Sequence, residues 1–147
     1  MYLVILALVV VSGAFVPVQA GVNAELGRHA GHPLLAGAAN FCVGLTAIVV
    51  MSLLVHVPLP SIARLAAVPW WGWIGGLLGA TLVVTAVIAA PRLGATLLVA
   101  ALVTGQLASS VVIDHFGWLG YPARPVTLLR VAGVVLLALG MGFVQRG

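Results

Sequence analysis

Hydrophobic residues fill the chain in long blocks, separated by short breaks that hold the charged residues and most of the prolines. The hydrocarbon core of a bilayer is about 30 Å thick, so a helix needs about 20 apolar residues to cross it. Blocks of this size predict five membrane-spanning helices, over residues 2–27, 34–57, 70–90, 93–113 and 126–144. Because every connection is short, we expect a single all-α transmembrane domain over residues 1–147.

Composition supports a membrane location and excludes a soluble domain. Hydrophobic residues make up 63% of the chain and charged residues only 5%, whereas a soluble domain has about 25% charged residues. The first block is kept as a helix and not as a cleaved secretory signal, because no basic residue precedes it. We therefore expect a multi-pass protein of the cell membrane, which in bacteria is the inner membrane, with the lipid bilayer as its solvent.

The basic residues do not indicate nucleic-acid binding. All six are arginines, and they are scattered singly along the chain, whereas phosphate backbones are bound by cations clustered on one face. The four histidines lack the i, i+4 spacing of a helical metal site, and Cys42 is the single cysteine. No motif indicates a nucleotide, a metal, a cofactor or a catalytic nucleophile, so we expect no enzyme.

Glycines point to close helix packing in two of the predicted helices. Small residues spaced four apart let transmembrane helices approach backbone to backbone. The glycines with such spacing, or seven apart on one face, are Gly72, Gly75, Gly76, Gly79, Gly133 and Gly140. The helices over residues 70–90 and 126–144 are thus predicted to pack closely, either within one subunit or between subunits.

The arginines give no preferred orientation. Five helices place the two ends of the chain on opposite sides, and cytoplasmic loops are normally enriched in arginine. One side receives Arg64, Arg124 and Arg130, and the other receives Arg28, Arg92 and Arg146. An even split can arise by chance, but it is also what a dual-topology protein shows. Such a chain inserts both ways up and forms an antiparallel homodimer with the inverted symmetry found in many transporters.

Several sequence stretches point to a known family. They are Gln19-Ala20-Gly21-Val22-Asn23, Asn40-Phe41, Pro69-Trp70-Trp71 followed by Gly75-Gly76-Leu77-Leu78-Gly79, and Leu93-Gly94-Ala95 through Gln106 to Asp114. With them the chain resembles, over essentially its whole length, the small YdcZ-type family of the drug/metabolite transporter superfamily. The resemblance implies a transport role and an assembly of antiparallel homodimers, paired partners or fused copies. It implies no particular substrate.

Polar side chains inside the hydrocarbon are costly, so each is a candidate for function. Gln106, Ser110 and Asp114 lie on one helix face about 12 Å long, and could line a site or bond neighbouring helices. Gln19 and Asn23 stand one turn apart just after Pro17, where we expect the helix to open locally. Asn40 is the third carboxamide of this group, and it too could serve only to bond helices.

The two acidic residues are the candidates for proton coupling. Glu25 lies three residues before Arg28, which favours an ion pair at the membrane interface, and Asp114 lies near a helix end, which favours a structural role. We predict a secondary transporter of an unknown small molecule. It would work by alternating access as an antiparallel homodimer, coupled to protons if either carboxylate titrates. The alternatives are a dual-topology ion channel and a non-transporting helical partner of another membrane protein.

Overall fold

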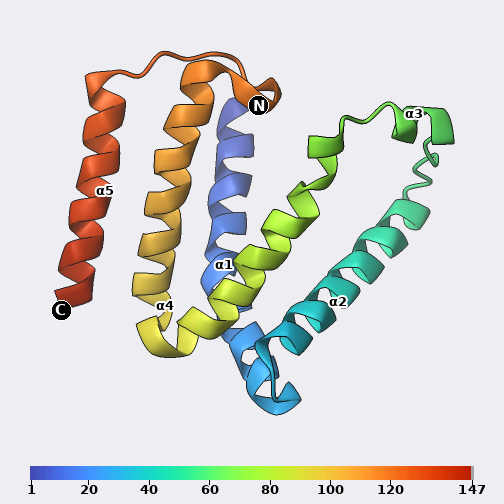
Figure 1. Ribbon diagram of the computed structural model, residues 1–147, viewed down its shortest axis with the longest axis horizontal. Helices are drawn as coiled ribbons and strands as arrows, with labels where there is room; N and C mark the ends of the chain where they lie inside the picture. Colours follow the sequence, from blue (N-terminus) through green and yellow to red (C-terminus); the bar gives the residue numbers. More distant parts are fainter. Residues whose placement is uncertain (147) are drawn as a thin grey trace. The chain divides into compact units, whose positions relative to one another are not determined.

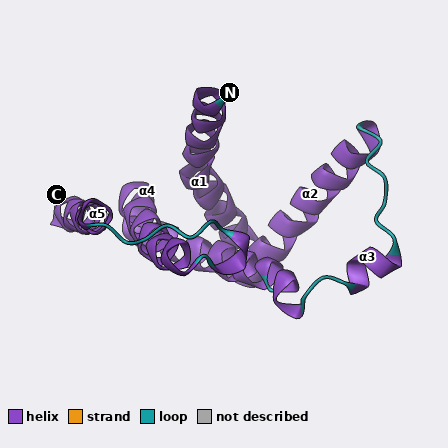
Figure 2. Ribbon diagram, turned by 90° about the horizontal axis from the view of Figure 1, so that it is seen from above, coloured by secondary structure: helices purple, strands orange, loops and turns teal. Residues whose placement is uncertain are grey.

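A computed structural model describes residues 1–146, and this part of the chain is helical without any β-strand (Figures 1 and 2). The α-helices are α1 (Tyr2–Ala30), α2 (Pro33–Leu54), α3 (Ile62–Ala66), α4 (Gly75–Phe116) and α5 (Leu128–Arg146), and short 3-10 helices cover Trp70–Trp73 and Trp118–Gly120. Four segments of the described chain are long and apolar enough to cross a membrane. The predicted all-helical membrane architecture is confirmed.

Contacts between residues divide the chain into two compact units. One unit joins Met1–Pro17 to the chain from Leu93 onward, and the other is Val18–Arg92. We call them the outer unit and the inner unit, after their places in the sequence, and describe each by itself. The single transmembrane domain expected from the sequence stays a prediction.

Helix α4 contains the third and fourth predicted spans. Its 42 residues are interrupted at Gly94, whose φ of 73° and ψ of 167° are not helical. The segment therefore holds two spans, which brings the chain from four long helices to the five expected. The predicted break at Pro91 and Arg92 was wrong by a few residues, because both are still helical. Glycine is the residue that adopts a positive φ without steric cost.

Several helix ends also differ from the predictions. Helix α1 continues to Ala30, and it runs through Pro17 without interruption, so the expected local opening is wrong. Pro17 has no backbone N–H to donate, but the loss of this one hydrogen bond does not break a helix of 29 residues. The span expected from Trp70 starts at Gly75, since Trp70–Trp73 forms a 3-10 turn.

The remaining ends shift by two or three residues. Helix α2 stops at Leu54 where Val57 was expected, because His56 has a φ of 53° and Val57 precedes a proline, which disfavours helix. Helix α5 starts at Leu128, after the expected residue 126. The short helix α3 lies in the connection between two predicted spans and was not predicted.

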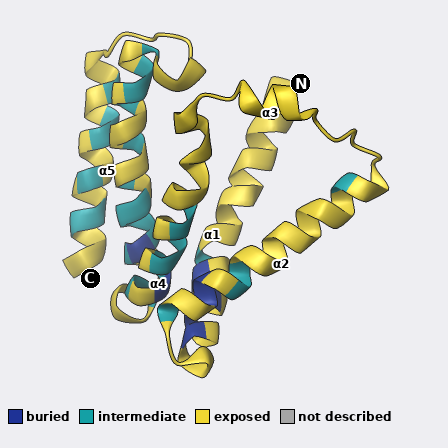
Figure 3. Cartoon of the chain, turned by 45° about the vertical axis from the view of Figure 1, so that its right-hand side comes forward, coloured by how far each residue is buried: buried dark blue, intermediate teal, exposed yellow. Residues whose placement is uncertain are grey.

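The core of the inner unit is made of small residues. Ala20, Ala24 and Ala36 are buried with Asn23 and Val87, and Figure 3 shows the buried residues gathering where α1 ends and α2 begins. Large apolar side chains are mostly exposed along α1, α2 and α5. In a bilayer those faces contact lipid, so the close contacts between helices are left to alanine and glycine.

Glycine packing differs from the sequence prediction. A Cβ atom placed on Gly27 would lie 3.0 Å from Val87 Cγ1, and one on Gly37 would lie 3.1 Å from Val84 Cγ2. These two glycines, which the sequence analysis did not single out, let α1 and α2 approach the first half of α4. The spacing that could have identified Gly27 is the series Ala20, Ala24 and Gly27 on α1.

The glycines that the sequence did single out have few close neighbours. Gly72 lies in the 3-10 turn beside Val68, and a Cβ atom placed on Gly79 would lie 3.8 Å from Phe41 Cζ. A Cβ atom on Gly75, Gly76, Gly133 or Gly140 would meet nothing within 4 Å. Packing of these four positions against a second copy stays a prediction.

Candidate functional site: an amide cluster on α1 and α2

Three carboxamide side chains meet in the inner unit. The Asn40 Oδ1 oxygen on α2 accepts one hydrogen bond from Gln19 Nε2 at 3.3 Å and another from Asn23 Nδ2 at 3.2 Å, both on α1. We call these three residues the amide cluster. The structure thus brings together all three of the carboxamides that the sequence placed on the first two helices.

The short turn between α1 and α2 sets the depth of the amide cluster. Gly31 has a φ of 79°, and the His32 ring accepts a hydrogen bond from the Leu34 backbone N–H at 3.2 Å, which caps α2. Asn23 lies eight residues before Gly31, and Asn40 lies eight residues after His32. At 1.5 Å per residue, both stand about 12 Å from the turn. The amide cluster therefore lies a little over two helical turns from the connection between α1 and α2.

The amide cluster keeps hydrogen-bonding capacity after its internal bonds are made. A carboxamide offers two N–H donors and one oxygen acceptor. In the described chain, the Nδ2 group of Asn40 and the side-chain oxygens of Gln19 and Asn23 form no hydrogen bond. No side-chain nitrogen or oxygen in this part of the chain is fully buried without a partner. The free amide groups are therefore reachable by a ligand or by water.

A hollow of about 480 Å³ adjoins the amide cluster. Gln19 and Asn40 line it on one side, and the remaining lining comes from Phe41, Val43, Gly44, Leu45 and Ile48 on α2. Its volume lies in the range of about 300–1,000 Å³ that is typical of small-molecule sites. The site therefore combines uncharged hydrogen-bonding groups with an apolar wall.

Two other predicted site residues lie in the outer unit. Gln106 is exposed, and no hydrogen bond of its side chain is found among residues 1–146. The Ser110 hydroxyl donates to the backbone carbonyl of Leu107 at 2.9 Å, within its own helix. The structure places neither residue in the amide cluster, so their role in binding stays a prediction.

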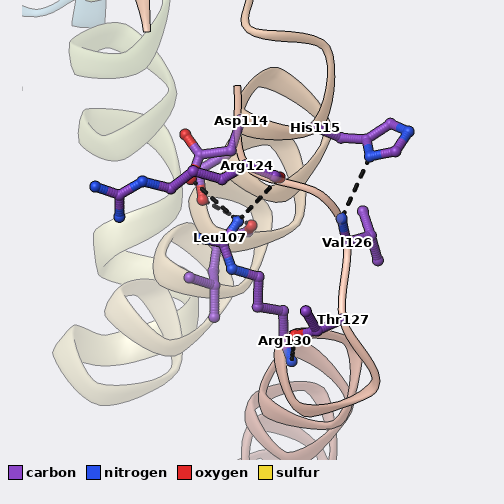
Figure 4. Close-up of polar contacts among 8 residues, drawn as sticks. Leu107, Asp114, His115, Arg124, Val126, Thr127 and Arg130 are labelled. Carbon is purple, nitrogen blue, oxygen red and sulfur yellow. Dashed lines mark hydrogen bonds and ion pairs between the residues drawn. The ribbon is translucent and has the colours of Figure 1, made fainter. Parts of the chain in front are cut away.

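Asp114 is held by a partner that the sequence analysis did not assign to it. Arg130 Nη1 on α5 donates to Asp114 Oδ2 at 3.3 Å (Figure 4), and the two side chains are 30% and 29% exposed. Arg130 lies two residues inside α5. Only two acidic residues are present to neutralise such a cation, and this scarcity is the signal that could have identified the pair.

The same residues close the connection between α4 and α5, which run side by side in the outer unit (Figures 1 and 2). The Arg124 backbone N–H donates to the Asp114 carbonyl at 2.7 Å, and Arg130 Nη1 also donates to the Arg124 carbonyl at 3.4 Å. His115 Nδ1 accepts from the Val126 N–H at 3.3 Å (Figure 4). This network ties the loop to both helix ends.

Glu25 is bound locally, as its spacing suggested. Its carboxylate forms an ion pair with Arg28 and lies 3.2 Å from His29 Nδ1, all on α1. The Glu25 side chain is 51% exposed and the Arg28 side chain 63% exposed. Exposed pairs within one helix are weak, worth about 0.3–0.5 kcal/mol. Neither acidic residue belongs to the amide cluster.

Comparison with known proteins places this architecture in a family. The sequence profile described as "Putative inner membrane exporter, YdcZ" matches residues 4–143, which is nearly the whole chain. The chain belongs to the YdcZ family. An 81-residue stretch is 33% identical to "Inner membrane protein YdcZ" of Escherichia coli (strain K12), covering 55% of this chain and 54% of that protein. The match thus spans about half the length of that curated relative.

The YdcZ family assignment and the long apolar helices together make this a multi-pass protein of the bacterial inner membrane. The family description concerns export across the inner membrane. No solved structure matches the chain.

Proposed function

We propose that this chain is a secondary carrier of a small solute, and that the amide cluster contacts the solute. The observation that carries the proposal is the meeting of Gln19, Asn23 and Asn40 within α1 and α2, beside a hollow of about 480 Å³. Polar side chains within transmembrane helices are costly in a bilayer and usually face a solute path. The family's link to export supports the same function.

The chemistry of the amide cluster defines a class of solute. Amides donate and accept hydrogen bonds without carrying charge, and the rest of the hollow is apolar. The group recognised at this site is therefore a neutral hydrogen-bonding group, such as a hydroxyl, amide or carbonyl, attached to an apolar body. A permanent charge would lack a counter-ion among the residues that line the hollow.

Alternating access requires more than one chain in this proposal. Five spans and the even division of six arginines fit insertion in both orientations. Two antiparallel copies then form an inverted pair around a central path. The free faces of Gly75, Gly76, Gly133 and Gly140 supply surfaces on which two copies can pack closely.

Proton coupling, if the carrier uses it, needs Asp114 or Glu25. Each carboxylate has a cationic partner, Arg130 or Arg28. Protonation would remove the negative charge and release the arginine. The Asp114 pair joins two helices, so its release would change the packing of α4 against α5. The Glu25 pair lies on one helix, so its release would leave helix packing unchanged.

The carrier proposal is tested by flux. A thermal-shift screen of cations, anions, sugars and neutral metabolites first identifies a ligand, and proteoliposomes then measure its transport. We expect saturable uptake with counterflow, stimulated by unlabelled ligand on the opposite side. A rapid current that does not saturate would show a channel instead. Absence of flux, together with an unrelated subunit that co-purifies in equal amount, would show a partner protein.

The antiparallel arrangement is tested by labelling in cells. In a Cys42→Ser background, Leu59→Cys, in the exposed loop after α2, is treated with a membrane-impermeant thiol reagent. Dual topology predicts that about half of the molecules react from outside and the other half only after the membrane is opened. Labelling of all molecules from one side would contradict the dimer while leaving the carrier function open.

A further inference from the structure

A second hollow lies near the turn between α1 and α2, apart from the amide cluster. Its volume is about 260 Å³, and the residues that line it include Arg28 and Arg92. Apolar residues, among them Pro33, Val87, Ile88 and Pro91, form the rest of the wall. We call it the arginine hollow. It lies wholly within the inner unit.

The charges around the arginine hollow do not cancel. Arg28 is paired with Glu25. Among residues 1–146, Arg92 takes part in no ion pair and its side chain forms no hydrogen bond. Two arginines thus line the hollow, and one carboxylate, that of Glu25, pairs with one of them, so the lining carries an excess positive charge beside an apolar wall. An anion supplied from outside the chain would balance it.

The two arginines also belong to the same membrane face. Arg28 stands two residues before the end of α1, and Arg92 stands two residues before the interruption at Gly94. These are the first and third connections of an up-and-down series of spans, and alternate connections of such a series lie on one side of the bilayer. The guanidinium groups are therefore placed at the level of lipid headgroups.

We propose that the arginine hollow binds a phosphate group, and that this group is the headgroup phosphate of an anionic phospholipid. Guanidinium groups match phosphate oxygens in bidentate geometry. Basic pockets between transmembrane helices bind such headgroups, and the walls formed by Val87 and Ile88 can take the start of an acyl chain. Free phosphate offers the same oxygens but has no apolar part to occupy the wall.

Native mass spectrometry in a neutral detergent tests this inference, which is independent of transport. Phosphatidylglycerol and phosphatidylcholine with identical acyl chains are titrated into the purified protein. We expect phosphatidylglycerol to bind at least about tenfold more tightly, because the choline cation of phosphatidylcholine neutralises the phosphate that both lipids share and is repelled by the excess positive charge of the hollow. Arg92→Gln and Arg28→Gln should each remove most of this preference. Equal binding of the two lipids by the wild type would overturn the proposal.

Two further variants separate a binding effect from a folding effect. Arg146→Gln removes an arginine at the end of α5, outside the hollow, and should bind phosphatidylglycerol like the wild type. Glu25→Gln removes the carboxylate that competes for Arg28 and should tighten phosphatidylglycerol binding several-fold, a gain that misfolding cannot produce. Unchanged affinity in Arg92→Gln would overturn the site.

Inorganic phosphate distinguishes the two sources of the anion. We expect millimolar phosphate to displace phosphatidylglycerol only weakly, and to protect the wild type less than the lipid does in a thermal-shift assay. Displacement that needs Arg92 shows that the phosphate group is the recognised element. Phosphate binding at Arg92 without any binding of phosphatidylglycerol would overturn the lipid assignment.

Discussion

The amide cluster in the inner unit and the Asp114–Arg130 pair in the outer unit both join helices that follow one another in sequence. Asn40 accepts two hydrogen bonds from α1 and keeps free donors of its own. Asp114 and Arg130 bond each other, and backbone groups of Asp114 and Arg124 complete the network (Figure 4). The amide cluster is neutral and keeps amide groups without a hydrogen-bond partner among residues 1–146, whereas the Asp114–Arg130 pair is charged and its charged groups bond each other.

The two groups differ in their places along the helices. The amide cluster lies about 12 Å along α1 and α2 from the turn between them, within apolar segments where polar side chains are costly. The Asp114–Arg130 pair lies near the C-terminal end of α4 and the N-terminal end of α5, where water and headgroups lower the cost of charge. We therefore propose solute contact for the neutral group and stabilisation of the connection between α4 and α5 for the charged pair.

Substitution of Asn40 is expected to have the largest effect on transport. Asn40→Ala removes the oxygen that orients both Gln19 and Asn23, and a polar group left without its partner costs about 1–3 kcal/mol. We expect kcat/KM for the ligand found by the screen to fall at least about tenfold, measured by counterflow in proteoliposomes. Helical content by circular dichroism should stay unchanged.

A hydroxyl on the same helix is the matched control. Thr46 Oγ1 donates to the Cys42 carbonyl of its own helix at 2.8 Å, so Thr46→Val should keep counterflow within about twofold of the wild type. If Asn40→Ala and Thr46→Val transport at the same rate, the amide cluster only holds α1 against α2. Its role would then be structural, like that of the Asp114–Arg130 pair.

Close approach of the helices that carry the amide cluster gives the next prediction. Gly37 lies one turn before Asn40 and faces Val84. Gly37→Leu overpacks this contact, and we expect the free energy of unfolding to fall by about 2–3 kcal/mol, as measured by titration with a denaturing detergent. Ala38→Leu adds the same side chain on an exposed position of α2 and should change stability by less than about 0.5 kcal/mol. Equal effects would show that α2 is not packed as described.

Much of this architecture could be predicted from the sequence because lipid imposes a length and a composition on each span. The positions of the polar amides were sufficient to group Gln19, Asn23 and Asn40. The interruption at Gly94 was placed a few residues too early, at Pro91 and Arg92, since a proline is the usual sign of a break and glycine is common in membrane helices. The 3-10 turn at Trp70–Trp73 could not be distinguished from helix by hydropathy alone.

The contact between Asp114 and Arg130 was harder to predict. Asp114 and Arg130 are separated by 16 residues, and their meeting depends on how the loop between α4 and α5 returns. Local spacing identified the pair on α1, because Glu25 and Arg28 lie within one turn. It could not identify a partner on another helix. The packing role of Gly27 and Gly37 was missed for the same reason.

Removal of the charge on Asp114 should affect stability more than transport. Asp114→Asn leaves Arg130 without its counter-ion. Because both side chains are about 30% exposed, we expect a loss of about 1–2 kcal/mol of unfolding free energy, below the value for a fully buried pair. Arg130→Gln should cost a similar amount, and the double variant less than the sum.

The side chain of Arg124 supplies the control for this pair. Arg124 joins the network through its backbone N–H and carbonyl, so Arg124→Gln should leave the free energy of unfolding nearly unchanged. If Asp114→Asn keeps full stability but loses accumulation driven by a pH difference, the carboxylate is a coupling group and the assignment of the charged pair to structure is wrong.

The smallest effect is expected at Glu25, whose ion pair with Arg28 is half exposed and lies within one helix. Solvent screens such a pair, so Glu25→Gln should lower the free energy of unfolding by less than about 0.5 kcal/mol, measured in detergent without added lipid. Counterflow should also stay near the wild-type rate, because Glu25 does not line the hollow beside the amide cluster. Loss of pH-driven accumulation with intact counterflow would instead make Glu25 the proton carrier. Solute contact by Gln19 and Asn23 and proton coupling by Glu25 would then both lie on α1, within the inner unit.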